Sequence, residues 1–148
     1  QSPGHVEKVL MVTQRFADKN PGEHAALVAA LAEACAWCDE PQNREPLAQL
    51  LSGASYLNLA SRVISPALLG RFDCGHDRVE TVSDFHVFHR GEANVPTAEK
   101  AATLQHALAS AGLLSADLAA DAALPRRLFR EDLYRAALQS HHHTTLTS

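Results

Sequence analysis

The segment from Asn20 to Pro41 constrains the fold most, because it has the start, the apolar content and the end of one long helix. Asn20 is a typical N-cap, Pro21 follows at the first helical position, and Glu23 can complete a capping box. Pro41 ends the helix, since the residue before a proline is disfavoured in the α conformation. Helical spacing predicts that one apolar stripe faces a core, formed by Leu27, Val28, Leu31, Ala34, Cys35 and Cys38. The rest of the chain is therefore expected to pack around this helix.

Shorter elements are predicted on both sides of the central helix. Residues 7–13 contain the run VLMVT, whose short length and β-branched residues favour a strand. Residues 14–19 are predicted to form a short helix. Residues 44–51 have the apolar spacing of another helix, with Gly53 available as a left-handed residue at its C-terminal end.

The second half of the chain contains three further helical patterns. Residues 59–70 are predicted to be a helix that Asn58 caps and Pro66 interrupts or kinks. Residues 97–112 are predicted to be a helix that begins with a threonine cap and stops at a glycine, and residues 130–139 are predicted to be the last helix. The sequence thus predicts one helical domain over residues 1–140, followed by a polar, disordered tail over residues 141–148.

The stretch between these helices, residues 71–96, contains the densest chemistry in the sequence. It is predicted to be a long loop, and long loops are either functional or poorly ordered. Its acidic, thiol and imidazole groups could line a metal or anion site: Asp73, Cys74, His76, Asp77, Asp84, His86 and His89. The alternative is that Phe85 and Phe88 dock on the helices while the histidines face solvent, and this alternative is favoured because the aromatic residues alternate with the histidines.

A zinc site is the sharpest alternative to a metal-free helical domain. Structural zinc needs four ligands such as three thiolates and one imidazole, and this chain offers Cys35, Cys38, Cys74 and His76. The first pair lies one turn apart inside the central helix, which is unlike a zinc knuckle and is better explained by two small apolar core residues. Three cysteines also exclude a complete disulfide framework. We therefore assign no metal and no cofactor from the sequence.

Catalytic and nucleic-acid-binding functions find little support. The chain has no nucleophile elbow, phosphate-binding loop, zinc-protease motif or dinucleotide fingerprint, so no catalytic residue is assigned and an enzyme is not expected. The formal net charge of −4 argues against a nucleic-acid partner. Guanidinium groups do match planar oxyanions, and the candidates for such contacts are Lys100, Arg126, Arg127 and Arg130. Solvation at the surface is the default for these charges.

The chain resembles the C-terminal part of the nitrate-binding proteins of ATP-binding-cassette (ABC) transporters, a family that includes bicarbonate-binding proteins and soluble nitrate sensors. Four segments carry the resemblance in the same order: KVLMVTQRFADKNP, ALVAALAEACAWCDEPQNRE, YLNLASRVISPALLGRFD and DFHVFHRGEANVP. The resemblance implies a mostly α fold, namely the helical C-terminal portion of a two-lobed periplasmic-binding-protein-like fold with at most one or two short strands. The strand at residues 7–13 would be the strand that crosses between the lobes.

The resemblance also sets functional expectations. Family members hold a small anion between two lobes and are much longer than this chain, which is therefore expected to be a fragment that binds nitrate or bicarbonate only with the missing lobe. If the chain belongs to a transporter, it would be periplasmic and its partner would be an ABC permease; if it belongs to a sensor, it would be cytoplasmic and its partner would be a regulator protein. The ligand-binding residues stay unassigned. Because alanine supplies much of the apolar content, the core is expected to be thin, and a homo-oligomer is a further possibility.

Overall fold

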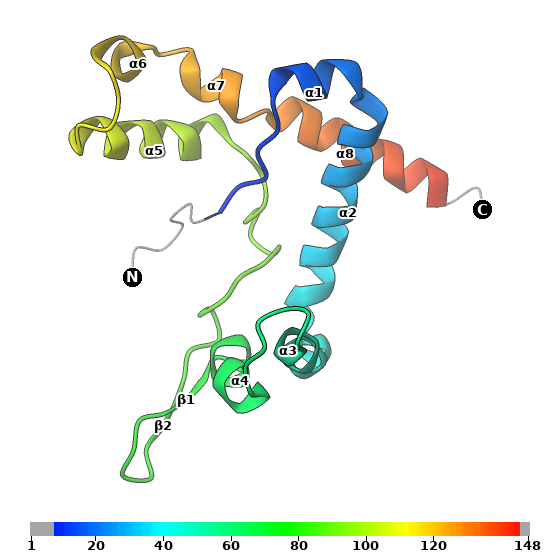
Figure 1. Cartoon of the computed structure of the whole chain (residues 1–148), viewed down its shortest axis with the longest axis vertical. Helices are drawn as coiled ribbons and strands as arrows, with labels where there is room; N and C mark the ends of the chain where they lie inside the picture. Colours follow the sequence, from blue (N-terminus) through cyan, green and yellow to red (C-terminus); the bar gives the residue numbers. More distant parts are fainter. Residues whose placement is uncertain (1–7, 146–148) are drawn as a thin grey trace. The chain divides into compact units, whose positions relative to one another are not determined.

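The computed structural model describes residues 8–145. In this part of the chain the fold is mostly helical with two short strands, as predicted (Figure 1). The chain divides into two compact units, residues 1–31 with 95–148 and residues 32–94, whereas the sequence suggested one domain. The central helix α2, Pro21–Asp39, begins in the first unit and ends in the second. Each of the described helices is too short or too polar to cross a lipid bilayer.

The first unit contains the predicted helices near both ends of the chain. Helix α1 spans Gln14–Lys19, α5 spans Ala98–Ser110 and α8 spans Glu131–Thr145. The side chains of Thr13 and Thr97 accept the backbone N–H groups of Phe16 and Lys100, so both helices start at a threonine cap. These three predictions are confirmed.

Two short helices of the first unit were not predicted. Helices α6, Ala116–Ala120, and α7, Leu124–Leu128, lie in the segment between α5 and α8. Their length of five residues each is too short for a helical period to stand out. Helix α8 also extends to Thr145, so the predicted tail begins inside a helix, while its last residues, 146–148, lie outside the described part.

The predicted core stripe of α2 is wrong for its largest side chains. Leu27 and Leu31 are 40% and 41% exposed, whereas the buried residues of this helix are Ala29 and Ala32. Alanines occur on every side of α2, so apolar spacing does not single out one face. Helical spacing alone therefore does not tell which side of α2 is covered.

The predicted strand at the start of the chain is also absent. Residues 8–13 form no strand, and Met11 is 85% exposed. A strand needs a neighbour for its backbone hydrogen bonds, and the described part of the chain places none beside this run. Glu7 lies outside the described residues.

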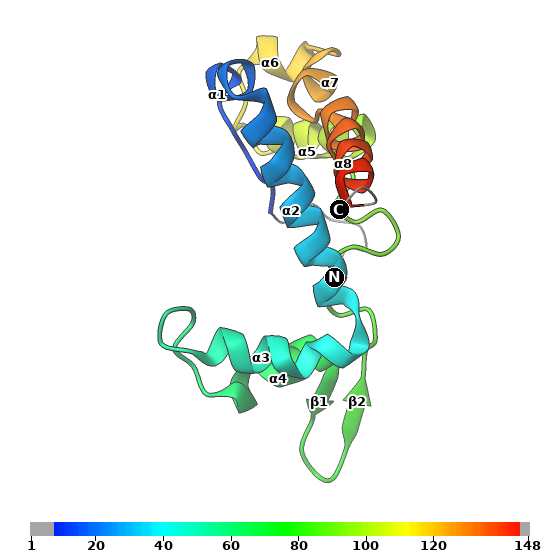
Figure 2. The same ribbon diagram turned by 90° about the vertical axis from the view of Figure 1, so that its right-hand side faces the viewer.

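The second unit contains two packed helices and a hairpin (Figure 2). The end of α2 leads through a 3-10 turn, Pro41–Asn43, to α3, Arg44–Ser52, and α4 spans Ser61–Leu69. Its core is small and is formed between α3 and α4 by Leu47, Ala48, Ile64 and Leu68, with Cys38, Leu51 and Phe88 packed against it.

Several predicted helix ends in the second unit differ from the structure. Gly53 follows α3 as expected but has φ −59°, so it is not left-handed. Asn58 does not cap α4, since Ala60 takes the cap position and Asn58 itself has φ 50°. Pro66 lies inside α4 without interrupting it. A helix cap requires particular φ and ψ angles at one residue. Glycine and asparagine occur in turns as well as at helix ends, so their presence in the sequence does not fix which residue is the cap.

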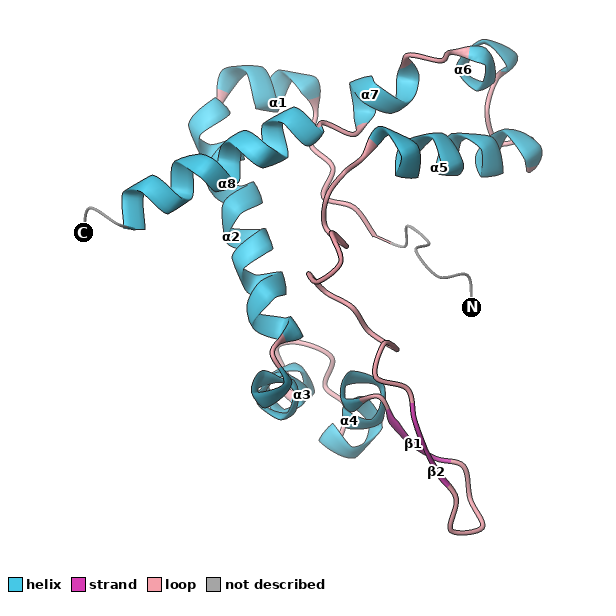
Figure 3. Cartoon of the chain, turned by 180° about the vertical axis from the view of Figure 1, so that it is seen from behind, coloured by secondary structure: helices cyan, strands magenta, loops and turns pink. Residues whose placement is uncertain are grey.

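Part of the predicted loop 71–96 is a hairpin (Figure 3). Strands β1, Arg71–Asp73, and β2, Val79–Thr81, pair antiparallel, with Arg71 opposite Thr81. Gly70 precedes the hairpin with φ 63°, and a Cβ atom there would overlap the carbonyl oxygen of Val82. Glycine is therefore required where the chain after β2 crosses the end of α4.

Candidate functional site

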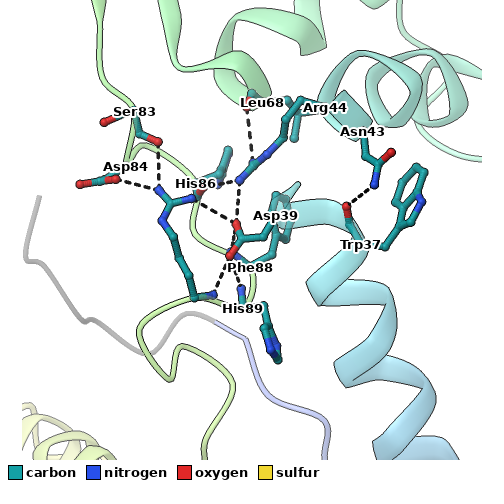
Figure 4. Close-up of polar contacts among 11 residues, drawn as sticks. Trp37, Asp39, Asn43, Arg44, Leu68, Ser83, Asp84, His86, Phe88 and His89 are labelled. Atoms are coloured by element: carbon teal, nitrogen blue, oxygen red, sulfur yellow. Dashed lines mark hydrogen bonds and ion pairs between the residues drawn. The ribbon is translucent and has the colours of Figure 1, made fainter. Parts of the chain in front are cut away.

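Asp39 is the centre of the polar contacts in the second unit (Figure 4). It is the last residue of α2, and its carboxylate accepts three consecutive backbone N–H groups: Phe88 at 3.1 Å, His89 at 2.8 Å and Arg90 at 2.6 Å. Consecutive N–H groups that converge on one point form a concave site for an anion. Here the chain's own carboxylate occupies that site and fixes residues 88–90 to the end of α2.

Two guanidinium groups complete the surroundings of this carboxylate. Arg44 donates to Asp39 Oδ1 at 2.7 Å, and their side chains are 8% and 9% exposed. Arg44 also donates to the carbonyl oxygens of Leu68 and His86, so it joins α3, α4 and the following loop. Arg90 lies 3.5 Å from Asp39 Oδ1 and pairs with Asp84 at 2.7 Å. We call Asp39, Arg44 and the N–H groups of residues 88–90 the carboxylate clamp.

The environment of Asp39 keeps it ionised. Burial alone would raise the pKa of its carboxyl group, but the backbone N–H donors of Arg90, Phe88 and His89, together with the charge of Arg90, hold that pKa below its usual value. A carboxylate at the C-terminal end of a helix is otherwise unfavourable, because the helix dipole is negative there. The clamp compensates for this cost, and an aspartate at a helix end is the sequence signal that could have indicated it.

Of the two aromatic residues predicted to dock on the helices, Phe88 does so, whereas Phe85 packs on a strand. The Phe88 ring packs on the core of α3 and α4, with the guanidinium carbon of Arg44 4.8 Å from its centroid. The Phe85 ring meets Phe72 of β1 edge to face at 4.7 Å between centroids. His86 is exposed, as predicted, whereas His89 is half-buried and lies 3.4 Å from the Asn94 side chain.

The other candidate ligands of this segment do not converge. Asp73 accepts the N–H of Gly75 at the hairpin turn, where Cys74, His76 and Asp77 are exposed. His76 and Asp77 both have positive φ, which belongs to the tight turn itself. Among the residues that the structure describes, no three histidine, cysteine or acidic side chains are placed to hold a metal ion.

The proposed zinc ligands are likewise separated along the fold. Cys35 and Cys38 lie half-buried on α2, and Cys38 packs on the α3–α4 core, as expected for a small apolar residue. Burial, followed by the neighbouring Cys35, raises the pKa of the Cys38 thiol. A raised pKa makes the thiol a poorer metal ligand and nucleophile, because both roles need the thiolate.

The basic residues considered for anion binding serve local contacts or lie in solvent. Lys100 donates to the carbonyl oxygen of Val95 at 2.9 Å, and Arg127 pairs with Asp121 at 2.7 Å. Arg126 is exposed. Arg130 pairs through two nitrogens with Asp132, and its hydrogen bond lowers the pKa of that carboxyl group to about 2.

A cleft of about 210 Å³ lies in the first unit beside Arg130. Residues of α1, the start of α2 and α8 line it: Gln14, Ala17, Asp18, Pro21, His24, Ala25, Val28, Arg130, Leu133, Ala136, Ala137 and Ser140. Its lining is largely alanine and aliphatic, and Asp18 and Arg130 add charges of opposite sign. This mixture does not select an anion.

Comparisons with known proteins place these features in a wider context. A family model described as the NMT1-like family matches residues 2–52. The nitrate import ATP-binding protein NrtC of Synechocystis sp. is 37% identical over 64% of this chain and 14% of its own length. The bicarbonate-binding protein CmpA of Synechococcus elongatus is 36% identical over 51% of this chain and 17% of its own length. The crystal structure of the periplasmic nitrate-binding protein NrtA from Synechocystis PCC 6803 matches 85% of this chain with a TM-score of 0.76 and 25% identity.

The chain is similar in sequence and in fold to nitrate- and bicarbonate-binding proteins. The resemblance seen in the sequence is thereby confirmed, and so is the mostly helical fold related to NrtA. The chain spans only 14% and 17% of the two curated relatives and 33% of the NrtA chain. Most of each relative therefore has no counterpart among these residues.

Proposed function

We propose that this chain is part of a periplasmic binding protein for a small oxyanion, nitrate in the first place, which serves an ABC transporter. The observation that carries the proposal is the match of 85% of the chain to a periplasmic nitrate-binding protein at a TM-score of 0.76. CmpA and NrtC add support, since one is named for bicarbonate binding and the other for nitrate import.

The chain's own role in this proposal is to support an anion site rather than to supply it. The N–H groups of residues 88–90 are already filled by Asp39, and Arg44 is held by the same carboxylate. A ligand cleft needs walls on both sides, and this chain spans a third of the matched NrtA structure. The residues that contact the anion are therefore expected in the part of the protein outside this chain.

A chimera tests the proposal. The matching third of Synechocystis NrtA is replaced by this chain, and nitrate binding is measured by calorimetry beside intact NrtA. We expect saturable nitrate binding within about tenfold of the intact protein, because the anion contacts stay in the unchanged part. A folded chimera that binds no nitrate would contradict the proposal. The control is the same chimera with Asp39→Ala in the clamp. We expect this substitution to lower the stability of the chimera and to leave its preference among anions unchanged.

The similarity to NrtC favours a second candidate function, in which the chain belongs to an ATP-binding component that senses the anion. NrtC is an ATP-binding protein, and its similarity extends over 64% of this chain. An antibody raised against this chain separates the two candidates in the native cell. A band released with the periplasmic fraction supports the binding protein, whereas a band retained with the membrane and captured on immobilised ATP supports the sensing component.

A further inference from the structure

The connection between α3 and α4, residues 53–60, displays apolar side chains to solvent. Tyr56 is 61% exposed and Leu57 is 53% exposed, and Leu59 follows with 48%. Leu50 near the end of α3 and Val63 near the start of α4 flank this connection in the sequence and are 50% and 59% exposed. We call these residues, Leu50, Tyr56, Leu57, Leu59 and Val63, the α3–α4 apolar surface.

This surface is ordered although it is uncovered. The carbonyl oxygen of Gly53 accepts the N–H groups of Tyr56 at 3.0 Å and Asn58 at 3.2 Å. The N–H group of Leu57 donates to the carbonyl oxygen of Leu51 at 3.0 Å. Asn58 adopts φ 50°, a left-handed conformation that asparagine tolerates better than most residues. The apolar side chains are thus presented by a folded turn, and binding there would require little further ordering of the backbone.

The composition of the surface fits a protein interface. Residues 50–61 contain no charged side chain, and the first charge after them is Arg62. Depletion of charge together with a tyrosine and several leucines is typical of the buried centre of an interface. Single exposed leucines are ordinary, but three large exposed apolar side chains within residues 56–59 of an uncharged connection are not.

We propose that the α3–α4 apolar surface packs against the part of the same binding protein that lies outside this chain. The argument for this occupant is length: the NrtA chain is three times as long as the portion matched here, and the match covers 85% of this chain. An uncharged surface held in one conformation fits a permanent neighbour in the same polypeptide better than a soluble partner that dissociates. This inference rests on the proposed function.

The experiment compares one variant in two contexts. Tyr56→Ser with Leu59→Ser is introduced into the isolated chain and into the NrtA chimera, and thermal unfolding is measured for each. In the isolated chain both side chains are exposed, so the midpoint is expected to stay within about 1 °C. In the chimera they become buried, and the midpoint is expected to fall by roughly 5 °C or more. Arg62→Ser on α4 is the control and is expected to change neither midpoint.

The outcomes separate this inference from the proposed function. If the chimera binds nitrate but its unfolding midpoint does not change with the double substitution, the proposed role of the α3–α4 apolar surface is contradicted and the proposed function is supported. If the substitution destabilises the chimera but the chimera binds no nitrate, the proposed role of the surface is supported and the proposed function is contradicted.

Sedimentation of the isolated chain is the second measurement and does not depend on the chimera. We expect weak association that rises with concentration and disappears in the double variant. A discrete dimer that becomes monomeric in the double variant would show that the surface binds a second copy of the chain, and this result would overturn the proposal. A wild-type chain that stays monomeric at high concentration would also count against it.

Discussion

Two connecting segments of the second unit show opposite ways of ordering a loop. Residues 83–90 are fixed by charge, because Asp39 accepts three N–H groups and pairs with Arg44 at 2.7 Å. Residues 53–60 are fixed by their own backbone, and their large side chains face solvent. The first segment is complete within this chain, whereas the second has apolar groups without a cover. The difference indicates which contacts stabilise the chain itself and which await a neighbour.

The largest expected effect follows removal of the clamp carboxylate. Asp39→Ala leaves the buried Arg44 guanidinium without its counter-charge and three backbone N–H groups without their acceptor, and we expect a loss of about 3–5 kcal/mol in the free energy of unfolding. Urea unfolding measures it, with the adjacent and exposed Glu40→Ala as control. If both variants unfold at the same urea concentration, the clamp contributes nothing.

A chemical rescue sharpens this result. Acetate or formate can occupy the space vacated in Asp39→Ala, because the same N–H groups and guanidinium then face a free planar carboxylate. We expect added formate to raise the midpoint of the variant and to leave the wild type unchanged beyond the general effect of salt, for which chloride at equal ionic strength is the control.

Gly70→Ala is expected to have an intermediate effect. The left-handed φ of 63° and the overlap of a Cβ atom with the Val82 carbonyl both oppose alanine, so the chain entering residues 83–90 must shift. We expect a loss of about 1–3 kcal/mol by urea unfolding. Gly112→Ala is the matched control, since Gly112 also has positive φ but has open space around its Cβ position. Equal losses would show that φ alone matters.

Acid should weaken the clamp in a defined direction. The pKa of Asp39 is lower in the folded chain than in the unfolded chain, so its contribution is complete above the unfolded value near 4 and is lost as the pH falls through the lowered folded value. Unfolding measured between pH 6 and pH 2 should show this loss in the wild type. Asp39→Asn should make the free energy of unfolding less dependent on pH between pH 6 and pH 2. An unchanged pH dependence would show that Asp39 does not contribute to the loss.

The smallest effect is expected in the apolar connection. Leu57 is half exposed, so Leu57→Ala in the isolated chain should change the free energy of unfolding by less than about 0.5 kcal/mol. Leu47→Ala, at a buried site on neighbouring α3, is the contrast and should cost about 2–5 kcal/mol. A large loss for Leu57→Ala would show that the connection is already covered within this chain.

Local signals in the sequence predicted the elements that depend on few residues. Thr97 caps its helix as predicted, because a cap acts within three residues. The carboxylate clamp escaped prediction because the N–H groups that bind Asp39 follow it by 49 to 51 residues. Two other predictions failed for a different reason, namely the burial of Leu27 and Leu31 and the strand at residues 8–13. An apolar pattern shows that a segment tends to be buried, but it does not identify the segment that would cover it.

The central claim is that this chain supports an oxyanion site but does not contain one, and titration of the isolated chain with nitrate tests it most directly. Calorimetry on the folded chain at neutral pH is expected to show no saturable heat, because the described N–H and guanidinium groups of the clamp are already bound to Asp39. Micromolar binding of nitrate to this chain alone would contradict the claim and would place a complete anion site within these residues.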